Sequence, residues 1–174
     1  KTIKTNLESN AVFKFTELLL DKNEWHYANS LFRSVKNEGD RSLLATMQFI
    51  FAKYHAERLE WAQVNNLLNN VATQLSPENA EYAYLLNGAA LQHLKKHRLA
   101  KKSYENIQPT SQYYSFARLN IAIADIRQGW WTDAQTTIND LIKNAQKDNS
   151  DELTNRLYLV LGYTLLHKDY YRDA

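Results

Sequence analysis

The sequence predicts an all-α fold in which antiparallel helix pairs repeat along a single domain. The 174 residues are 44% hydrophobic and 23% charged, which is the composition of a folded domain rather than of a disordered or membrane-spanning chain. Only four Gly and two Pro are present, too few for the regular turns of an all-β fold or for a glycine-rich phosphate loop. Aromatic and small residues recur every 34 to 40 residues, which indicates a helical repeat.

Five ring-bearing residues mark this repeat, at spacings of 36, 36, 34 and 40 residues: Trp25, Trp61, His97, Trp131 and Tyr171. Small or short residues flank each ring at two fixed positions. Three positions after the rings stand Ala28, Val64, Ala100, Ala134 and Ala174, and nine positions before them stand Thr16, Ala52, Gly88, Ala122 and Gly162. Larger residues follow the small residue that stands after the ring. Four positions after it come Phe32, Leu68, Tyr104 and Ile138, and seven positions after it come Val35, Val71, Ile107 and Leu141. This stripe predicts one face of a second helix that begins near each ring.

Capping residues predict where the first helix of each pair begins. Asp40, Ser76 and Ser150 are expected N-caps, and residues 109–111 (PTS) separate another pair. A glycine inside a helix costs about 1 kcal/mol relative to alanine, so Gly88 and Gly162 need a compensating reason. We therefore expect close helix crossings at Gly88, Ala122 and Gly162, and we expect no strand.

Two segments carry a family resemblance. Residues 84–91 read YLLNGAAL and are followed by AKKSY at 100–104, while residues 158–165 read YLVLGYTL. In these motifs the chain resembles the tetratricopeptide repeat (TPR) proteins. The resemblance implies a right-handed superhelical solenoid over residues 1–174, with units near 9–40, 42–76, 77–110, 111–149 and 151–174, the last one incomplete.

The resemblance also implies a concave groove lined by the first helices, which would bind a peptide or a protein. The residues expected to line it are Phe13, Glu17, Phe49, Lys53, Tyr82, Leu85, Ala89, Gln92, Phe116, Asn120, Ile123, Arg127, Arg156, Tyr163 and His167. This set is more apolar than charged and lacks the basic ring with which carboxylate-clamp members of the family hold a C-terminal carboxylate. It favours a helix or an extended apolar peptide as the occupant, or a helix of the chain's own missing C-terminal part.

The predicted function is a non-catalytic scaffold or adaptor that binds a protein or peptide in this groove. The alternative is a structural assembly module that uses its end or edge surfaces for association with copies of itself or with other subunits. No nucleophile elbow, zinc-protease motif or phosphate loop occurs, so no enzyme activity and no cofactor are predicted.

Four polar, charged or histidine-containing groups are candidate sites. His93 and His97 are four residues apart, but they lack a third metal ligand and lie among basic residues, so we predict no metal site. The basic run at 95–102 fits a solvated helix connection as well as nucleic acid, and the net charge of +2 favours no nucleic-acid partner. Arg118 and Asp125 are expected to form an ion pair, directly or through neighbours. Polar Gln48 and His55, at aromatic positions of the second unit, are expected to tune packing.

Cysteine is absent and no apolar run of about 18 residues could insert into a membrane, so we expect a soluble protein of the cytoplasm or periplasm. Lys1 is not an initiator methionine, and we expect the numbering to start after a tag, a cleaved signal or a domain cut. Ala174 falls at the small position of an unfinished second helix. We therefore expect the protein to continue with at least one further helix, and this uncapped end to pack or self-associate.

Overall fold

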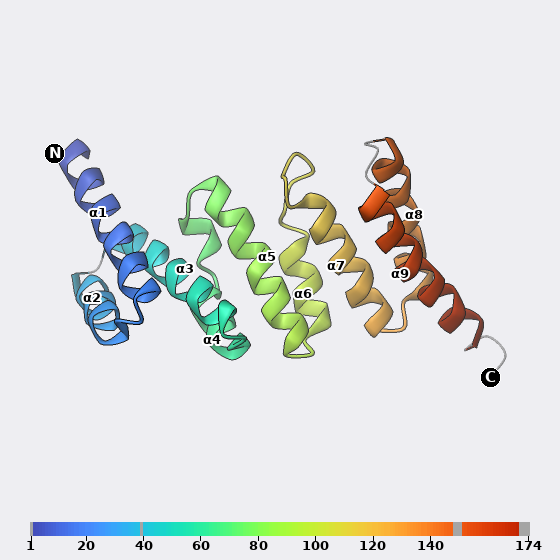
Figure 1. Ribbon diagram of the computed structural model, residues 1–174, viewed down its shortest axis with the longest axis horizontal. Coiled ribbons are helices and arrows are strands. Elements are labelled where there is room, and N and C mark those ends of the chain that lie inside the picture. The colour runs from blue at the N-terminus through green and yellow to red at the C-terminus, as the bar shows by residue number, and fades with distance from the viewer. Residues whose placement is uncertain (1, 39, 148–150, 171–174) are drawn as a thin grey trace. The chain divides into compact units, whose positions relative to one another are not determined.

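The computed structural model describes the backbone of residues 2–38, 40–147 and 151–170 and the side chains of 11–37, 40–145 and 154–167. Within these ranges the chain is helical and contains no strand, which confirms the all-α prediction (Figure 1). The helices are α1 (Thr2–Asp21), α2 (Trp25–Glu38), α3 (Arg41–Glu57), α4 (Trp61–Leu68), the 3-10 turn η1 (Ala72–Gln74), α5 (Pro77–His93), α6 (His97–Tyr104), α7 (Tyr114–Arg127), α8 (Trp131–Lys147) and α9 (Asp151–Tyr170).

The chain divides into two compact units, Lys1–Ala90 and Leu91–Ala174, with the boundary inside α5. In the first unit α1 packs against α2 and α3, and α3 also packs against α2, α4 and η1. In the second unit α6 packs against α7, α7 against α8, and α8 against α9. Helices that are consecutive in the chain are therefore neighbours within each unit.

The predicted starts of the second helices are confirmed. Four of the rings that mark the repeat are the first residues of α2, α4, α6 and α8: Trp25, Trp61, His97 and Trp131. The cap predicted before α3 is also present, since the backbone N–H of Leu43 donates to the Asp40 carboxylate at 2.9 Å. Helix α5 begins at Pro77 as expected, whereas Ser150 and Tyr171 lie outside the described residues.

One turn geometry precedes each of these second helices. The residue two positions before each ring has a left-handed backbone, with φ between 58° and 77°: Asn23, Leu59, Lys95 and Gly129. The next backbone N–H donates to a carbonyl five residues earlier, at 2.8 to 3.0 Å, in the pairs Glu24–Leu19, Glu60–His55, Lys96–Leu91 and Trp130–Asp125. This is the Schellman pattern, which satisfies the last carbonyls of the first helix while reversing the chain.

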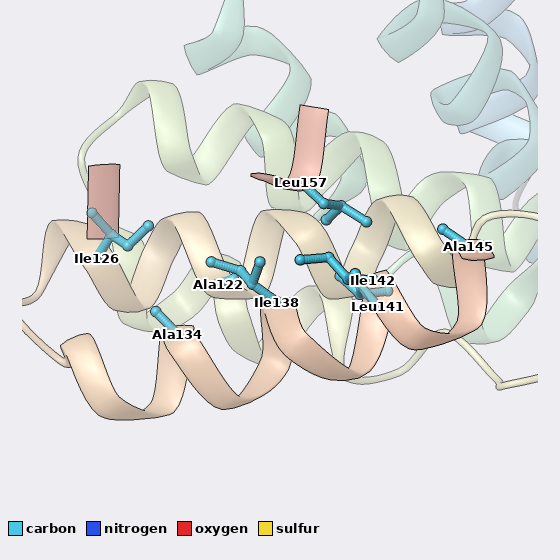
Figure 2. Close-up of a cluster of buried hydrophobic side chains, with 8 residues drawn as sticks. All are labelled: Ala122, Ile126, Ala134, Ile138, Leu141, Ile142, Ala145 and Leu157. Atoms are coloured by element: carbon cyan, nitrogen blue, oxygen red, sulfur yellow. The ribbon is translucent and has the colours of Figure 1, made fainter. Parts of the chain in front are cut away.

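Small positions of paired helices share core clusters within each unit, Ala52 with Val64 in the first and Ala122 with Ala134 in the second. Full burial is observed at Thr16, Ala28, Ala52, Val64, Ala100, Ala122 and Ala134, and Gly88 is buried as well. Figure 2 shows one crossing, where Ala122 of α7 and Ala134 and Ile138 of α8 share a cluster with Leu157 of α9. Side chains without bulk allow this close approach.

The expected crossing at Gly162 stays a prediction, because its partner helix falls on residues that the structure does not describe. A Cβ atom built on Gly162 would meet nothing within 4 Å, and the residue is exposed. No described helix crosses α9 there, because the second helix expected for that unit would begin at Tyr171, outside the described residues.

Two of the second helices, α4 and α6, are shorter than the apolar stripe predicted for them. Helix α4 ends at Leu68 and α6 ends at Tyr104, so Val71 and Ile107 fall beyond them, although both are buried. The left-handed backbone of Asn70, at φ 60°, prevents α4 from reaching Val71. Helix α6 is capped by Asn106, whose side-chain amide donates to the Lys102 carbonyl in the last turn at 2.7 Å.

Replacing Leu59 by glycine should raise the free energy of unfolding by about 1 kcal/mol, because a left-handed backbone is strained in residues other than glycine. Leu59 is 69% exposed, so its side chain contributes little packing. Chemical denaturation measures the change. The matched control is Gly129→Leu, whose Cβ would have only an ordinary contact at 3.9 Å and which should destabilise the chain by a similar amount. A less stable Leu59→Gly variant would contradict the strain assigned to this turn.

Candidate functional site

In the second unit, an open pocket lies between the two helices α7 and α9. It has a volume of about 260 Å³ and is lined by Ile123, Ile126, Arg127, Leu159, Val160 and Tyr163. Leu159 is 76% exposed, so apolar surface faces solvent at its rim. Three of the predicted groove residues, Ile123, Arg127 and Tyr163, therefore come together in what we call the α7–α9 pocket.

Arg127 gives this pocket its charge. It is exposed in the last turn of α7, and none of the other residues that line the pocket is charged. The pKa of His97 is lowered by burial first, then by the positive charges of Arg127 and Lys95. The buried Nδ1 of His97 has no hydrogen-bond partner within the described part of the chain. This end of the unit thus carries positive charge that would attract a carboxylate.

In the first unit, a second pocket lies between α1 and α3. It has a volume of about 290 Å³ and is lined by Glu17, Leu20, Asp21, Ile50, Lys53, Tyr54 and Glu57. The Lys53 Nζ donates to the Glu17 Oε1 at 3.0 Å, which uses the one cation of this lining. The exposed carboxylates Asp21 and Glu57 make the pocket more acidic than the α7–α9 pocket.

Other predicted groove residues of the first unit pack into its interior to different extents. Phe49 is 4% exposed and belongs to the core cluster that also contains Val64 and Leu68 of α4, so it is a core side chain rather than an accessible one. Its ring meets Tyr82 edge to face at 5.8 Å. Tyr82 and Phe13 are half-buried against core clusters, and Leu85 and Ala89 are half-buried.

Gln92 has a packing role that the sequence did not suggest. Its Oε1 accepts a hydrogen bond from the Tyr104 hydroxyl at 2.7 Å, and its Nε2 donates to the Asn120 carbonyl at 3.1 Å. The Asn120 amide in turn donates to the carbonyl of Phe116 at 2.9 Å. Gln92 thus joins α5, α6 and α7. Burial raises the pKa of Tyr104, so its hydroxyl keeps its proton.

Several predicted groove residues remain accessible. Phe116 is 56% exposed on α7, and Arg156 is exposed on α9. His167 is half-buried, with its ring stacked on Trp131 at 5.6 Å and close to Tyr163 at 4.3 Å. These ring contacts restrict the orientation of Tyr163 at the α7–α9 pocket.

The ion pair expected for Asp125 forms with a different cation. The Lys101 Nζ donates to both carboxylate oxygens, at 2.9 and 3.2 Å, whereas Arg118 donates to the Thr137 hydroxyl at 3.4 Å. Asp125 is 1% exposed, and its burial raises its pKa despite the opposing hydrogen bond and charge of Lys101. Lys101 of the basic run is therefore engaged inside the protein.

His55, the polar substitution noted in the second unit, is also engaged. Its ring meets Trp25 edge to face at 5.5 Å, and its Nδ1 bonds the carboxylate of Glu60. Among the described residues, no group of three or more His, Cys, Asp or Glu side chains could hold a metal ion.

The described helices include none that is both long and apolar enough to cross a membrane. No model of a known protein family matches the sequence, and a comparison with curated proteins finds no match. The resemblance to TPR proteins thus stays a prediction.

Replacing Lys101 by methionine should lower the free energy of unfolding by about 3 to 5 kcal/mol at neutral pH, because it leaves the Asp125 carboxylate buried without its cation. A carboxyl group whose pKa is higher in the folded chain binds its proton more tightly there. The loss should therefore shrink as the pH falls toward about 4, close to the ordinary pKa of aspartate.

Denaturation at a series of pH values measures this effect. The matched control is Lys102→Met, an exposed neighbour that should change stability by less than about 0.5 kcal/mol. Equal losses in both variants, or a loss that grows on acidification, would contradict the role of the Lys101–Asp125 pair.

Proposed function

We propose that this chain is a non-catalytic protein-interaction scaffold or adaptor, built as a right-handed TPR-like solenoid, that binds a peptide or helix on the face formed by its first helices. The α7–α9 pocket is the observation that carries this proposal. It combines predicted groove residues from two helices that occupy equivalent positions in the repeat. In such a solenoid the first helices line the concave face.

The side chains of this pocket suggest the kind of segment it would bind. Its walls are aliphatic and aromatic, so burial of an apolar side chain there would remove exposed apolar surface from water. Tyr163 is a large amphipathic ring of the kind that anchors interfaces. Arg127 adds a cation at the same pocket. The favoured partner is therefore a segment that presents an apolar side chain beside a carboxylate.

A displayed library of random peptides, selected on the intact chain, tests this proposal. We expect selected peptides to pair apolar with acidic residues, and Tyr163→Ala to weaken their binding at least about tenfold, which corresponds to about 1.4 kcal/mol. Arg127→Glu should weaken binding of the acidic peptides. Titration calorimetry measures affinity, and circular dichroism checks that the variants remain helical.

The matched control is Leu99→Ala, which alters an exposed apolar residue on a second helix and should leave binding unchanged. Peptides that bind the folded Tyr163→Ala and Arg127→Glu variants as tightly as they bind the unaltered chain would contradict the proposal.

One observation favours a structural assembly module as a second candidate. Helix α9 exposes an apolar strip that includes Tyr158, Leu165 and Leu166, with Gly162 open among them. Ala122, the equivalent of Gly162 on α7, is fully buried in a cluster with residues of α8. The strip therefore has the shape of a surface that another helix covers.

The adaptor and the assembly module predict different effects of substitutions at Tyr163 and Leu166. If light scattering shows concentration-dependent self-association that Leu166→Glu abolishes, while peptide binding does not depend on Tyr163, the assembly module replaces the adaptor. Leu166 is exposed and does not line the α7–α9 pocket, so its substitution tests the strip alone.

A further inference from the structure

The first unit carries a large apolar pocket formed by α1, α2 and the turn between them. It has a volume of about 620 Å³ and is lined by Phe15, Leu19, Glu24, Tyr27, Ser30, Leu31 and Ser34. Phe15 is 55% exposed, and Leu18 and Tyr27 nearby are exposed as well. This pocket, which we call the α1–α2 pocket, shares no residue with the α7–α9 pocket.

The repeat shows what covers the equivalent surface one unit later. Phe51 stands 36 residues after Phe15, at the same position relative to the ring that starts the second helix. Unlike Phe15, Phe51 is only 3% exposed. Its ring lies 4.9 Å from Phe32 and 5.3 Å from Trp25, measured between ring centroids, and both of these rings belong to α2.

A second pair of equivalent residues gives the same result. Leu67 of α4 stands 36 residues after Leu31 and packs against the core cluster that contains Ala28 and Val35 of α2. His55, the equivalent of Leu19, also meets the Trp25 ring. Helix α2 thus occupies, on α3 and α4, the position that the α1–α2 pocket leaves open on α1 and α2.

We propose that the α1–α2 pocket docks an amphipathic helix that resembles α2, with two aromatic rings seven residues apart on one face. Residues seven apart share a face of a helix, as Trp25 and Phe32 do when they cover Phe51. Glu24 is the one charged residue of the lining, so the docked helix carries a basic residue at its edge.

A labelled synthetic peptide with the sequence of residues 24–38 (EWHYANSLFRSVKNE) is the probe, because this segment covers the equivalent surface within the chain. Fluorescence anisotropy with the whole chain should show saturable binding. Phe15→Glu and, separately, Tyr27→Glu should weaken it at least tenfold, as should replacement of both Trp25 and Phe32 by alanine in the peptide.

The matched control is Leu99→Glu, because Leu99 is 50% exposed, lies on the other unit and lines neither the α1–α2 nor the α7–α9 pocket; this variant should bind the peptide normally. Circular dichroism identifies any variant that unfolds, and two glutamate variants are available at the pocket. Absence of saturable binding, or equal binding by the folded glutamate variants and the unaltered chain, would overturn the proposal. Self-association that Phe15→Glu abolishes would also overturn it, because a second copy would then occupy the pocket.

Discussion

The structure depends on close contact between small side chains where the first and second helices of a pair cross. Ala52 and Val64 in the first unit, and Ala122 and Ala134 in the second, are fully buried in shared clusters. Helix axes that approach to about 8 to 10 Å leave no space for a larger side chain at these crossings. This approach places each second helix so that its leading ring can reach the following first helix, as Trp25 reaches Phe51.

The turns between paired helices reinforce the same geometry through the backbone. The left-handed residue that ends a first helix is asparagine, leucine, lysine or glycine in different pairs. Its position is constant although its identity is not, because the carbonyls of the preceding helix impose the conformation and the chain tolerates the strain in Leu59 and Lys95. For this reason the turn is evident in the backbone but leaves no single residue type in the sequence.

Periodicity was sufficient to predict the all-α class and the starts of the described second helices, since rings and small residues recur at fixed positions within each pair. It predicted the α7–α9 pocket only in part. Ile123, Arg127 and Tyr163 meet there, but Ile126, Leu159 and Val160 were missed. Phe49 lies in the core because α4 covers it. Spacing along one helix also suggested Arg118 as the ion-pair partner of Asp125.

The partner of Asp125 comes instead from another helix, 24 residues earlier in the chain. Contacts between helices depend on side-chain direction and length, which spacing along one helix does not give. The long side chain of Lys101 reaches across from α6 to α7. The surfaces proposed for binding have a common origin: each lies where the repeat leaves a helix face uncovered, on α1 and α2 or on α9.

The most direct test of the account is the stability of Ala134→Leu compared with Ala62→Leu, measured by urea denaturation. Alanine and leucine have nearly equal helix propensities, so the comparison isolates the space at the crossing. Ala134 is fully buried opposite α7, whereas Ala62 is exposed on α4. We expect Ala134→Leu to lower the free energy of unfolding by about 1 to 3 kcal/mol and Ala62→Leu to change it little. Equal stability of the two variants would contradict the dependence of the fold on close helix crossings.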